Sequence, residues 1–174
     1  HRQSSAASDV YKRQDLEMSF VEQEDVFNVV ETLMVNTFKK FSNKKLMYDK
    51  FPKISYADAM LNYGSDKPDL RNPLLINDIT EIFTREDVSF EIFKKLVKSG
   101  SIVRCISTKD TKDKPRSFFD NIDKWAKEQG ASGLAYFTFE KENQLSAKGP
   151  IGKFFSEEAL EEIMKKTNSE VGDS

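Results

Sequence analysis

The sequence predicts an α+β protein, in which helices and short strands follow one another without a regular βαβ repeat. Three observations support this prediction. The chain has 174 residues, enough for one full-sized domain or two small ones. Its 14 Phe, 5 Tyr and 1 Trp supply bulky groups for a packed core. Apolar residues recur with the period of a strand in some segments and with the period of a helix in others.

Composition excludes several classes of protein. Hydrophobic residues make up 38% and charged residues 32% of the chain, which predicts a lean core and a strongly ionised surface. Apolar runs stay well below the roughly 20 residues of a membrane span, so we expect no membrane contact and a cytoplasmic location. A single cysteine (Cys105) and a single histidine (His1) exclude an intrachain disulfide, a Cys/His zinc site and a histidine-based triad. We therefore expect no metal site.

The first fourteen residues differ from the rest, because they show neither helical nor strand periodicity. The segment Ser4–Gln14 resembles the translation of a transposon-end sequencing adapter. We expect residues 1–14 to be a non-native or disordered tail without a function, and we set them aside.

Local patterns predict the elements of residues 15–87. Polar and apolar residues alternate over Asp15–Phe20, which predicts a half-buried strand with Asp15 and Glu17 on one face. An amphipathic helix is expected over residues 24–41, with its apolar stripe in the core. A short strand is expected at Leu46–Tyr48. Ser55 begins a capping box and a helix over Tyr56–Tyr63 that ends at Gly64.

From Val88 the pattern changes, and we place a domain boundary there. Strands are predicted over Phe90–Phe93, Ile102–Ser107 and Leu134–Phe139. Helices are predicted over Arg116–Gln129, closed by Gly130, and over Glu157–Thr167, capped by Ser156. The buried residues of these two helices are expected to be Phe118, Ile122, Trp125 and Ala126, then Leu160, Ile163 and Met164. Cys105 is expected to be a small core residue.

Five motifs carry a family resemblance that covers residues 15–174. They are DLEMSF at residues 15–20, Phe51-Pro52, YGSDKPDLRNP at residues 63–73, GASGLAY at residues 130–136 and GPIGKFF at residues 149–155. The first three resemble the bacterial-type aspartyl-tRNA synthetases of class II, beginning inside the second class II motif. The last two resemble the GAD insertion domain of the same family, and Gly172-Asp173 resembles the return into the catalytic domain.

The resemblance implies a domain layout. Residues 15–87 would form part of a class II catalytic domain, an antiparallel sheet with helices. Residues 88–168 would form an inserted α+β GAD-like domain, and residues 169–174 would begin the return to the catalytic domain.

The resemblance also implies a reaction. In the family, aspartate attacks the α-phosphate of ATP, normally with Mg²⁺, and the aspartyl group then passes to tRNA-Asp. Whether tRNA-Asn is also a substrate stays open at this point. Several features of the family have no match in the chain. They are the arginines of the second and third motifs, a histidine, the anticodon-binding domain and the first motif, which forms the dimer interface. The resemblance implies a homodimeric parent enzyme with ATP, Mg²⁺ and L-aspartate as ligands. Because these features are missing, we expect the 174-residue chain to be inactive and to bind neither ATP nor Mg²⁺.

Candidate site residues follow from the resemblance and from charge. The position matching Asp15 contacts the α-ammonium group of aspartate in the family, and Glu17 would support the site from the same face. The loop residues Ser65, Asp66, Lys67, Asp69 and Arg71 would form a rim near the adenylate or the tRNA acceptor end, or would pair with one another to lock the loop. The basic residues Lys109, Lys112, Lys114 and Arg116 would contact tRNA phosphates, or would form only a solvated surface.

A second function remains open. GAD-type domains also occur in tRNA-dependent amidotransferases, so the chain could be a non-catalytic module that contacts RNA or protein. DLEMSF and YGSDKPDLRNP favour the synthetase, because they resemble catalytic-domain sequence.

Overall fold

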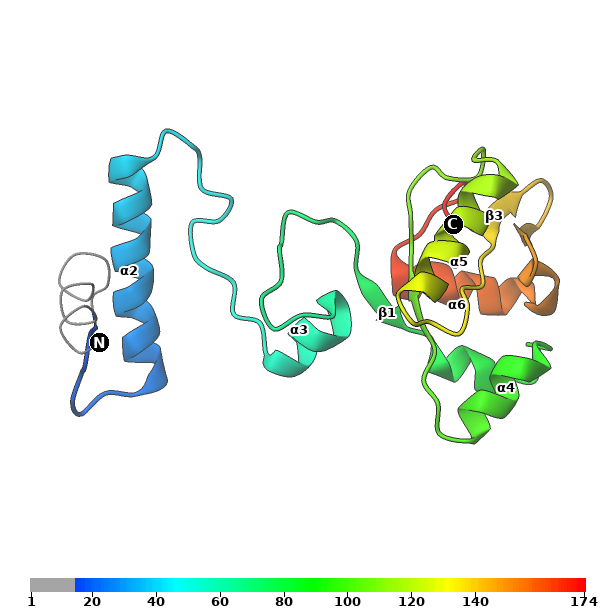
Figure 1. Ribbon diagram of the computed structural model, residues 1–174, viewed down its shortest axis with the longest axis horizontal. Coiled ribbons are helices and arrows are strands. Elements are labelled where there is room, and N and C mark those ends of the chain that lie inside the picture. Colours follow the sequence, from blue (N-terminus) through cyan, green and yellow to red (C-terminus); the bar gives the residue numbers. More distant parts are fainter. Residues whose placement is uncertain (1–14) are drawn as a thin grey trace. The chain divides into compact units, whose positions relative to one another are not determined.

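A computed structural model describes residues 15–174, and the adapter-like segment lies outside the described residues. The chain packs as two compact units, one ending at Lys53 and the other spanning Ile54–Ser174 (Figure 1). The mixture of helices and small antiparallel sheets confirms the predicted α+β class.

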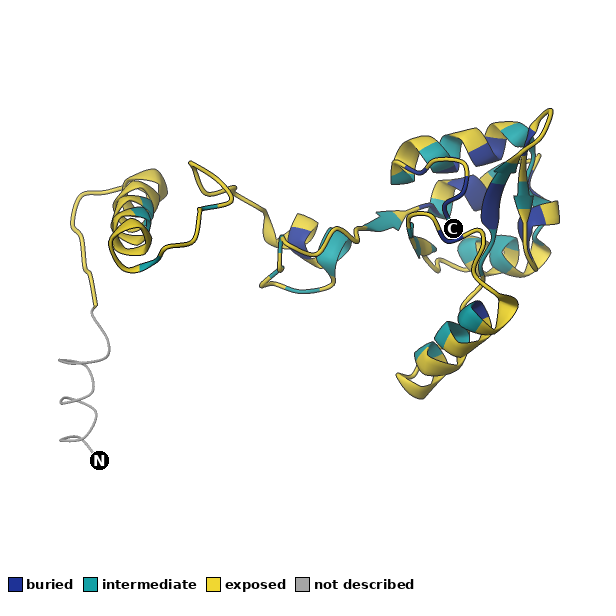
Figure 2. Cartoon of the chain, turned by 90° about the horizontal axis from the view of Figure 1, so that it is seen from above, coloured by how far each residue is buried: buried dark blue, intermediate teal, exposed yellow. Residues whose placement is uncertain are grey.

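The first unit contains one long helix, α2 (Gln23–Phe41), where the sequence predicts it. The acidic residues Glu24 and Asp25 lie in its first turn and the basic residues Lys39 and Lys40 in its last, so both ends complement the helix dipole. The prediction that its apolar stripe is core was wrong for the described structure. No residue of α2 is buried, and nearly the whole helix is exposed in Figure 2. A single helix has no second apolar layer in its own unit to pack against.

The strand predicted for Asp15–Phe20 is absent, because this segment is irregular and exposed. Alternation of polar and apolar residues places side chains on two faces, but a strand also needs a hydrogen-bonded neighbour. Within residues 15–53 no segment pairs with it, and the strand predicted at Leu46–Tyr48 is likewise absent. The chain after α2 is held instead by the backbone N–H of Phe51, which donates to Glu31 Oε2 at 3.0 Å, and by an ion pair between Lys53 and Glu24.

The second unit opens with α3 (Tyr56–Tyr63), as predicted. The N–H of Asp58 donates to Ser55 Oγ at 3.0 Å, which satisfies one of the free donors at the helix start. The helix ends at Gly64, whose φ of +68° is the left-handed conformation that closes many helices. Helix α3 packs beside the first strand, β1.

Four short strands form two antiparallel pairs. The first pair joins β1 (Ile76–Asp78) to β2 (Arg104–Ile106), with Asn77 opposite Cys105. The second is a hairpin of β3 (Thr138–Lys141) and β4 (Leu145–Lys148). Strands β2 and β3 confirm parts of two predicted strands, whereas β1 and β4 were missed.

Helix α4 (Glu91–Lys98) corrects the strand predicted for Phe90–Phe93. Phe90, Phe93 and Val97 all pack against the core, and this spacing is helical. A strand would have put Phe90 and Phe93 on opposite faces. Four residues are too few for the period to be recognised, and this is why the prediction failed.

The core of the second unit joins segments far apart in the sequence. The turn of 3₁₀ helix η1 (Thr80–Thr84) contributes Ile82 and Phe83, and α6 (Glu157–Thr167) contributes Ala159, Leu160 and Ile163. These pack with Val88, Phe139 of β3 and Leu145 of β4. The predicted helix 157–167, its Ser156 cap and its inward residues Leu160 and Ile163 are confirmed, while Met164 is only half-buried. Because η1 shares this core, packing joins residues 79–87 to the part after Val88.

Phenylalanine rings form one edge of this core. Phe83 lies 5.2 Å from Phe93 and 5.8 Å from Phe155, measured between ring centroids. Phe137 contacts Phe155 at 5.2 Å. Part of the high Phe content of the chain is therefore used here, where the rings pack beside the aliphatic residues of the core.

Helix α5 (Arg116–Glu128) confirms the predicted helix, but its predicted buried face was right only in part. Phe119 is the residue that points inward and is 7% exposed, whereas Trp125 is 62% exposed. Phe118, Ile122 and Ala126 are half-buried. Phe119 turns inward because it stacks on Tyr136, a contact between segments that periodicity does not reveal.

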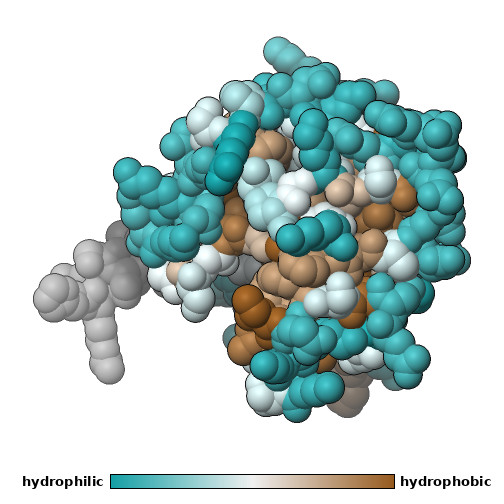
Figure 3. Space-filling model, turned by 90° about the vertical axis from the view of Figure 1, so that its right-hand side faces the viewer, coloured by the Kyte–Doolittle hydropathy of each residue, from teal (hydrophilic) through white to brown (hydrophobic). Residues whose placement is uncertain are grey.

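The surface of the second unit is strongly ionised, as the composition predicts. Figure 3 shows hydrophilic side chains around a smaller apolar area on the face turned to the viewer. Within residues 15–174, no helix has both the length and the apolar character needed to cross a bilayer.

The GPIGKFF motif predicts a sharp response to one substitution. A Cβ atom on Gly152, in the 3₁₀ turn η2 (Gly152–Phe154), would lie well inside van der Waals distance of the carbonyl group of Ala147. We expect Gly152→Ala to lower the free energy of unfolding of this unit by about 1–3 kcal/mol, because β4 must move to make room. Urea unfolding followed by the fluorescence of Trp125 measures this.

Gly133→Ala is the matched control, because a Cβ atom there would meet only side-chain atoms, at 3.6 Å or more. Equal stability of the two variants would contradict the close approach at Gly152.

Candidate functional site

Asp15 and Glu17 belong to the first unit, and all other predicted site residues belong to the second. Both acidic side chains are exposed and lie on irregular backbone. The structure therefore does not place them on one face of a strand, and their predicted roles stay predictions.

The loop residues Ser65–Arg71 form local pairs, as the loop-locking interpretation predicts. Lys67 and Asp66 form an ion pair at 2.7 Å. Arg71 Nε and Nη2 donate to the two carboxylate oxygens of Asp69 at 2.8 and 2.6 Å. The hydrogen bond from the Arg71 side chain lowers the pKa of Asp69 to about 2. The N–H of Lys67 donates to Ser65 Oγ at 3.1 Å, so all five predicted residues take part in contacts within the loop. The predicted rim near the adenylate remains a prediction.

Lys109 is held in a structural clamp. Its Nζ donates to Asp173 Oδ2 and to the carbonyl oxygen of Asn168, both at 2.7 Å. The Asp173 carboxylate is 3% exposed and also accepts the N–H groups of Asp110 at 3.1 Å and Glu170 at 2.8 Å. Burial raises the pKa of Asp173, but the hydrogen bonds, led by that from Lys109, outweigh it and hold the pKa below its usual range.

The clamp fastens residues 172–174 along residues 108–112. The N–H of Thr108 donates to the carbonyl oxygen of Ser174 at 2.8 Å, and the N–H of Lys112 donates to that of Gly172 at 3.0 Å. The hydroxyl oxygens of Thr108 and Ser174 lie 2.7 Å apart. The backbone of Lys112 is therefore fixed while its side chain projects outward.

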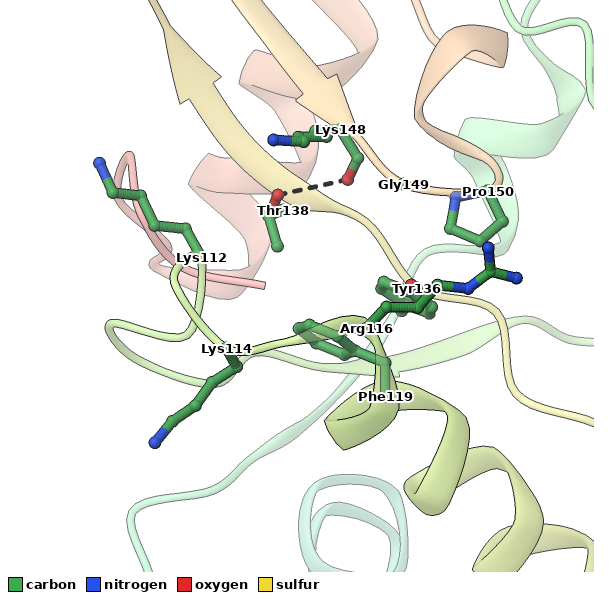
Figure 4. A pocket seen from close by; sticks show the side chains of 9 residues that line it. All are labelled: Lys112, Lys114, Arg116, Phe119, Tyr136, Thr138, Lys148, Gly149 and Pro150. Carbon is green, nitrogen blue, oxygen red and sulfur yellow. Dashed lines mark hydrogen bonds between the residues drawn. The ribbon is translucent and has the colours of Figure 1, made fainter.

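Next to this clamp lies a hollow of about 530 Å³, which we call the basic hollow (Figure 4). Its lining combines four cationic side chains with two aromatic rings, and none of its nine residues is acidic. The lining residues are Lys112, Lys114, Arg116, Phe119, Tyr136, Thr138, Lys148, Gly149 and Pro150.

The cations of the basic hollow are only weakly neutralised by acidic neighbours. Arg116 lies 3.5 Å from Asp120 and is 84% exposed, and Lys148 lies 3.7 Å from Glu140 and is 77% exposed. Such long, exposed ion pairs contribute little, so the positive charge stays available to an anionic ligand.

Two stacked rings form the apolar part of the hollow. Phe119 and Tyr136 lie 4.1 Å apart between centroids, with ring planes 3° from parallel. The neighbouring turn at Gly149 needs glycine, because its φ is +138° and an added Cβ would lie 2.9 Å from Phe137 Cα. The motifs GASGLAY and GPIGKFF therefore meet at this hollow.

Three of the four predicted basic residues are brought together here, and Lys109 is not among them. Sequence reasoning missed Lys148 because it did not predict β4. It missed Phe119 and Tyr136 because their stacking joins α5 to the segment before β3. Basic residues close to the GPIGKFF motif were the one signal that could have pointed to Lys148.

The structure offers neither a reactive cysteine nor a metal-binding cluster among its described residues. Cys105 packs against the core, as predicted, and burial raises the pKa of its thiol to about 11, so it is not a ready nucleophile. In the described part of the chain no three carboxylate, cysteine or histidine side chains gather in a way that fits a metal ion.

The ion pair and hydrogen bonds of Asp173 predict that the free energy of unfolding depends on pH. Because the folded-state pKa of Asp173 is lowered, its contribution to stability is complete above its unfolded pKa of about 4 and is lost as the pH falls through the folded value. We expect Asp173→Asn to lower the free energy of unfolding by roughly 1.5–3 kcal/mol at pH 7. Urea unfolding at several pH values between 3 and 7 measures both quantities.

The difference between wild type and variant should shrink towards pH 3. Asp113→Asn is the control, because Asp113 is an exposed residue of the same loop. A difference that is independent of pH would contradict the ionised clamp.

Comparisons with known proteins agree with the motifs. The family model of the class II tRNA synthetases (D, K and N) matches residues 10–169. The aspartate–tRNA(Asp/Asn) ligase of Pelagibacter ubique is 79% identical over 160 residues, which cover 92% of this chain and 27% of that protein. The ligases of the same name from Ehrlichia chaffeensis and Methylorubrum populi are 57% and 49% identical over 161 residues.

The chain thus spans about a quarter of the length of these relatives. Because the family model matches most of the chain, the sequence and the comparisons lead to one conclusion: the chain belongs to the class II tRNA synthetases of the D, K and N group.

Proposed function

We propose that the chain is a section of an aspartate–tRNA ligase, an enzyme that activates aspartate with ATP and transfers it to tRNA. The observation that carries the proposal is the 79% identity over 160 residues to a ligase of that name, together with the motif YGSDKPDLRNP. These catalytic-type motifs favour the ligase over a non-catalytic module of an amidotransferase. The names of the relatives support tRNA-Asp and tRNA-Asn as substrates of the parent enzyme.

Within this proposal, residues 15–87 are part of the catalytic domain, residues 88–168 are the GAD-like insertion and residues 169–174 lead back. Asp15 holds the α-ammonium group of aspartate through a charge-assisted hydrogen bond, and Glu17 supports it. The locked loop Ser65–Arg71 forms a rigid rim near the adenylate or the acceptor end. The match of the segment DLEMSF at residues 15–20 to the family supports this role.

ATP and Mg²⁺ serve the family in general, but the described residues of this chain offer no side-chain cluster that fits the metal ion. No cluster of carboxylates suited to a metal ion occurs within residues 15–174. We assign no step to this chain through either group. The parent enzyme is proposed to be a homodimer in the cytoplasm.

The proposed role of Asp15 is tested in the complete parent enzyme. We expect Asp15→Asn to raise the KM for aspartate about 10- to 100-fold in aspartate-dependent pyrophosphate exchange, because an amide cannot balance the charge of the ammonium group. The KM for ATP should stay within about twofold of the wild-type value, because Asp15 is not proposed to touch the nucleotide.

Glu24→Gln is the control, because this exposed acidic residue forms an ion pair with Lys53 among the described residues and should leave the KM for aspartate unchanged. An unchanged KM for aspartate in Asp15→Asn would contradict the assigned role while leaving the ligase activity itself intact.

A separate measurement concerns the 174-residue chain alone. We expect it to catalyse no aspartate-dependent pyrophosphate exchange above background, because residues for ATP are supplied elsewhere in the parent. The complete enzyme, assayed in parallel, provides the positive control, and measurable exchange by the short chain would refute this division of roles.

A further inference from the structure

We propose that the basic hollow binds one unpaired nucleotide of the tRNA. Lys112, Arg116 and Lys148 would hold its phosphate and the adjacent phosphates, and its base would lie against the face of Tyr136 that is not stacked on the buried Phe119. This inference rests on the proposed function and adds a defined RNA site to it.

Charge provides the first argument. The cationic residues border one hollow from three separate parts of the fold, the loop 108–115, the first residue of α5, and β4, and their charged ends extend in different directions around it (Figure 4). A surface that is merely solvated has no need to bring them around one hollow. Asp120 and Glu140 lie close to two of these cations, but at distances of 3.5 and 3.7 Å they leave them able to reorient towards a phosphate.

The ring pair provides the second argument. Single-stranded nucleic acids are commonly held by bases that stack on aromatic side chains beside a cationic groove. A base inside a duplex has both faces covered, so only an unpaired base can enter a hollow to reach a ring. The hollow of about 530 Å³ lies in the range of roughly 300–1,000 Å³ that is usual for small-ligand sites, which is suitable for one nucleotide rather than a helical stem.

Rigidity provides the third argument. The backbone of Lys112 is fixed to Gly172, and Thr138 Oγ1 donates to the carbonyl oxygen of Lys148 at 3.3 Å. Gly149 allows the turn beside Tyr136 to approach closely. The hollow therefore exists before a ligand arrives, and little ordering is needed on binding.

The same features favour RNA over an acidic segment of protein. Carboxylates would use the cations but not the Tyr136 ring, whereas a nucleotide uses both. An acidic peptide is therefore treated as an outcome of the test.

The test uses the complete parent enzyme and deacylated tRNA-Asp. We expect the triple variant Lys112→Gln, Arg116→Gln, Lys148→Gln to raise the Kd for tRNA at least tenfold at physiological salt. The slope of log Kd against log salt should fall by about 2, because about 0.7 is lost for each phosphate contact to a single strand. The control is Lys98→Gln, Lys124→Gln, Lys165→Gln, which removes the same charge from exposed positions of the same unit outside the hollow.

The ring pair is tested separately. Tyr136→Leu should raise the Kd about 5- to 100-fold, whereas Tyr136→Phe should bind like wild type, because a phenyl ring still stacks. A benzophenone amino acid at position 148 should cross-link to one unpaired position of the tRNA. Cross-links spread over both strands of a stem would overturn the unpaired-nucleotide site, as would equal binding by the hollow variant and its control.

The two proposals fail in different ways. If the wild-type parent does not aspartylate tRNA, the proposed function is wrong. If it does, but a polyglutamate competitor binds the hollow and the triple variant has the same Kd for tRNA as the wild type, only the nucleotide site is wrong.

Discussion

The hydrogen-bonded, buried carboxylate of Asp173 is the constraint on which the position of the loop beside the basic hollow depends. It is almost inaccessible to solvent and accepts hydrogen bonds from the Lys109 side chain and from the backbones of Asp110 and Glu170. A buried charge without such donors would be strongly destabilising, so the donors must stay where they are. The clamp thereby fixes the loop that carries Lys112 and Lys114 and sets one wall of the basic hollow.

The same contact explains why charge alone is a poor guide to function. Lys109 looks equivalent to Lys112 and Arg116 in the sequence, yet its ammonium group forms an ion pair with the buried carboxylate of Asp173. Asp66, Lys67, Asp69 and Arg71 likewise satisfy one another within the loop. Only the fold separates cations that hold the protein together from cations that are free to meet a ligand.

Sequence patterns predicted the elements that are set locally. The helices α2, α3, α5 and α6 have long periodic stripes or explicit caps, such as Ser55 with Gly64 and Ser156 with Ala159, and they appear where expected. The failures depend on partners distant in sequence. Asp15–Phe20 alternates like a strand but has no neighbour to pair with among the described residues. Phe90–Phe93 was too short for its helical spacing to show, and the inward turn of Phe119 depends on Tyr136.

The candidate site was predicted in part, because Lys112, Lys114 and Arg116 are close together in sequence, whereas Lys148 and the ring pair join it only through β4 and α5.

The segment 104–112 has a mechanical consequence. At one end it pairs with β1, and at the other it carries residues 172–174, so two stretches nearly a hundred residues apart are tied to the same short piece of backbone. Because the backbone on either side of Lys112 is attached in this way, a ligand that pulls on the Lys112 side chain should displace β1 and residues 172–174 together with this segment. We therefore expect the unit to move as a rigid body, without local bending of the loop.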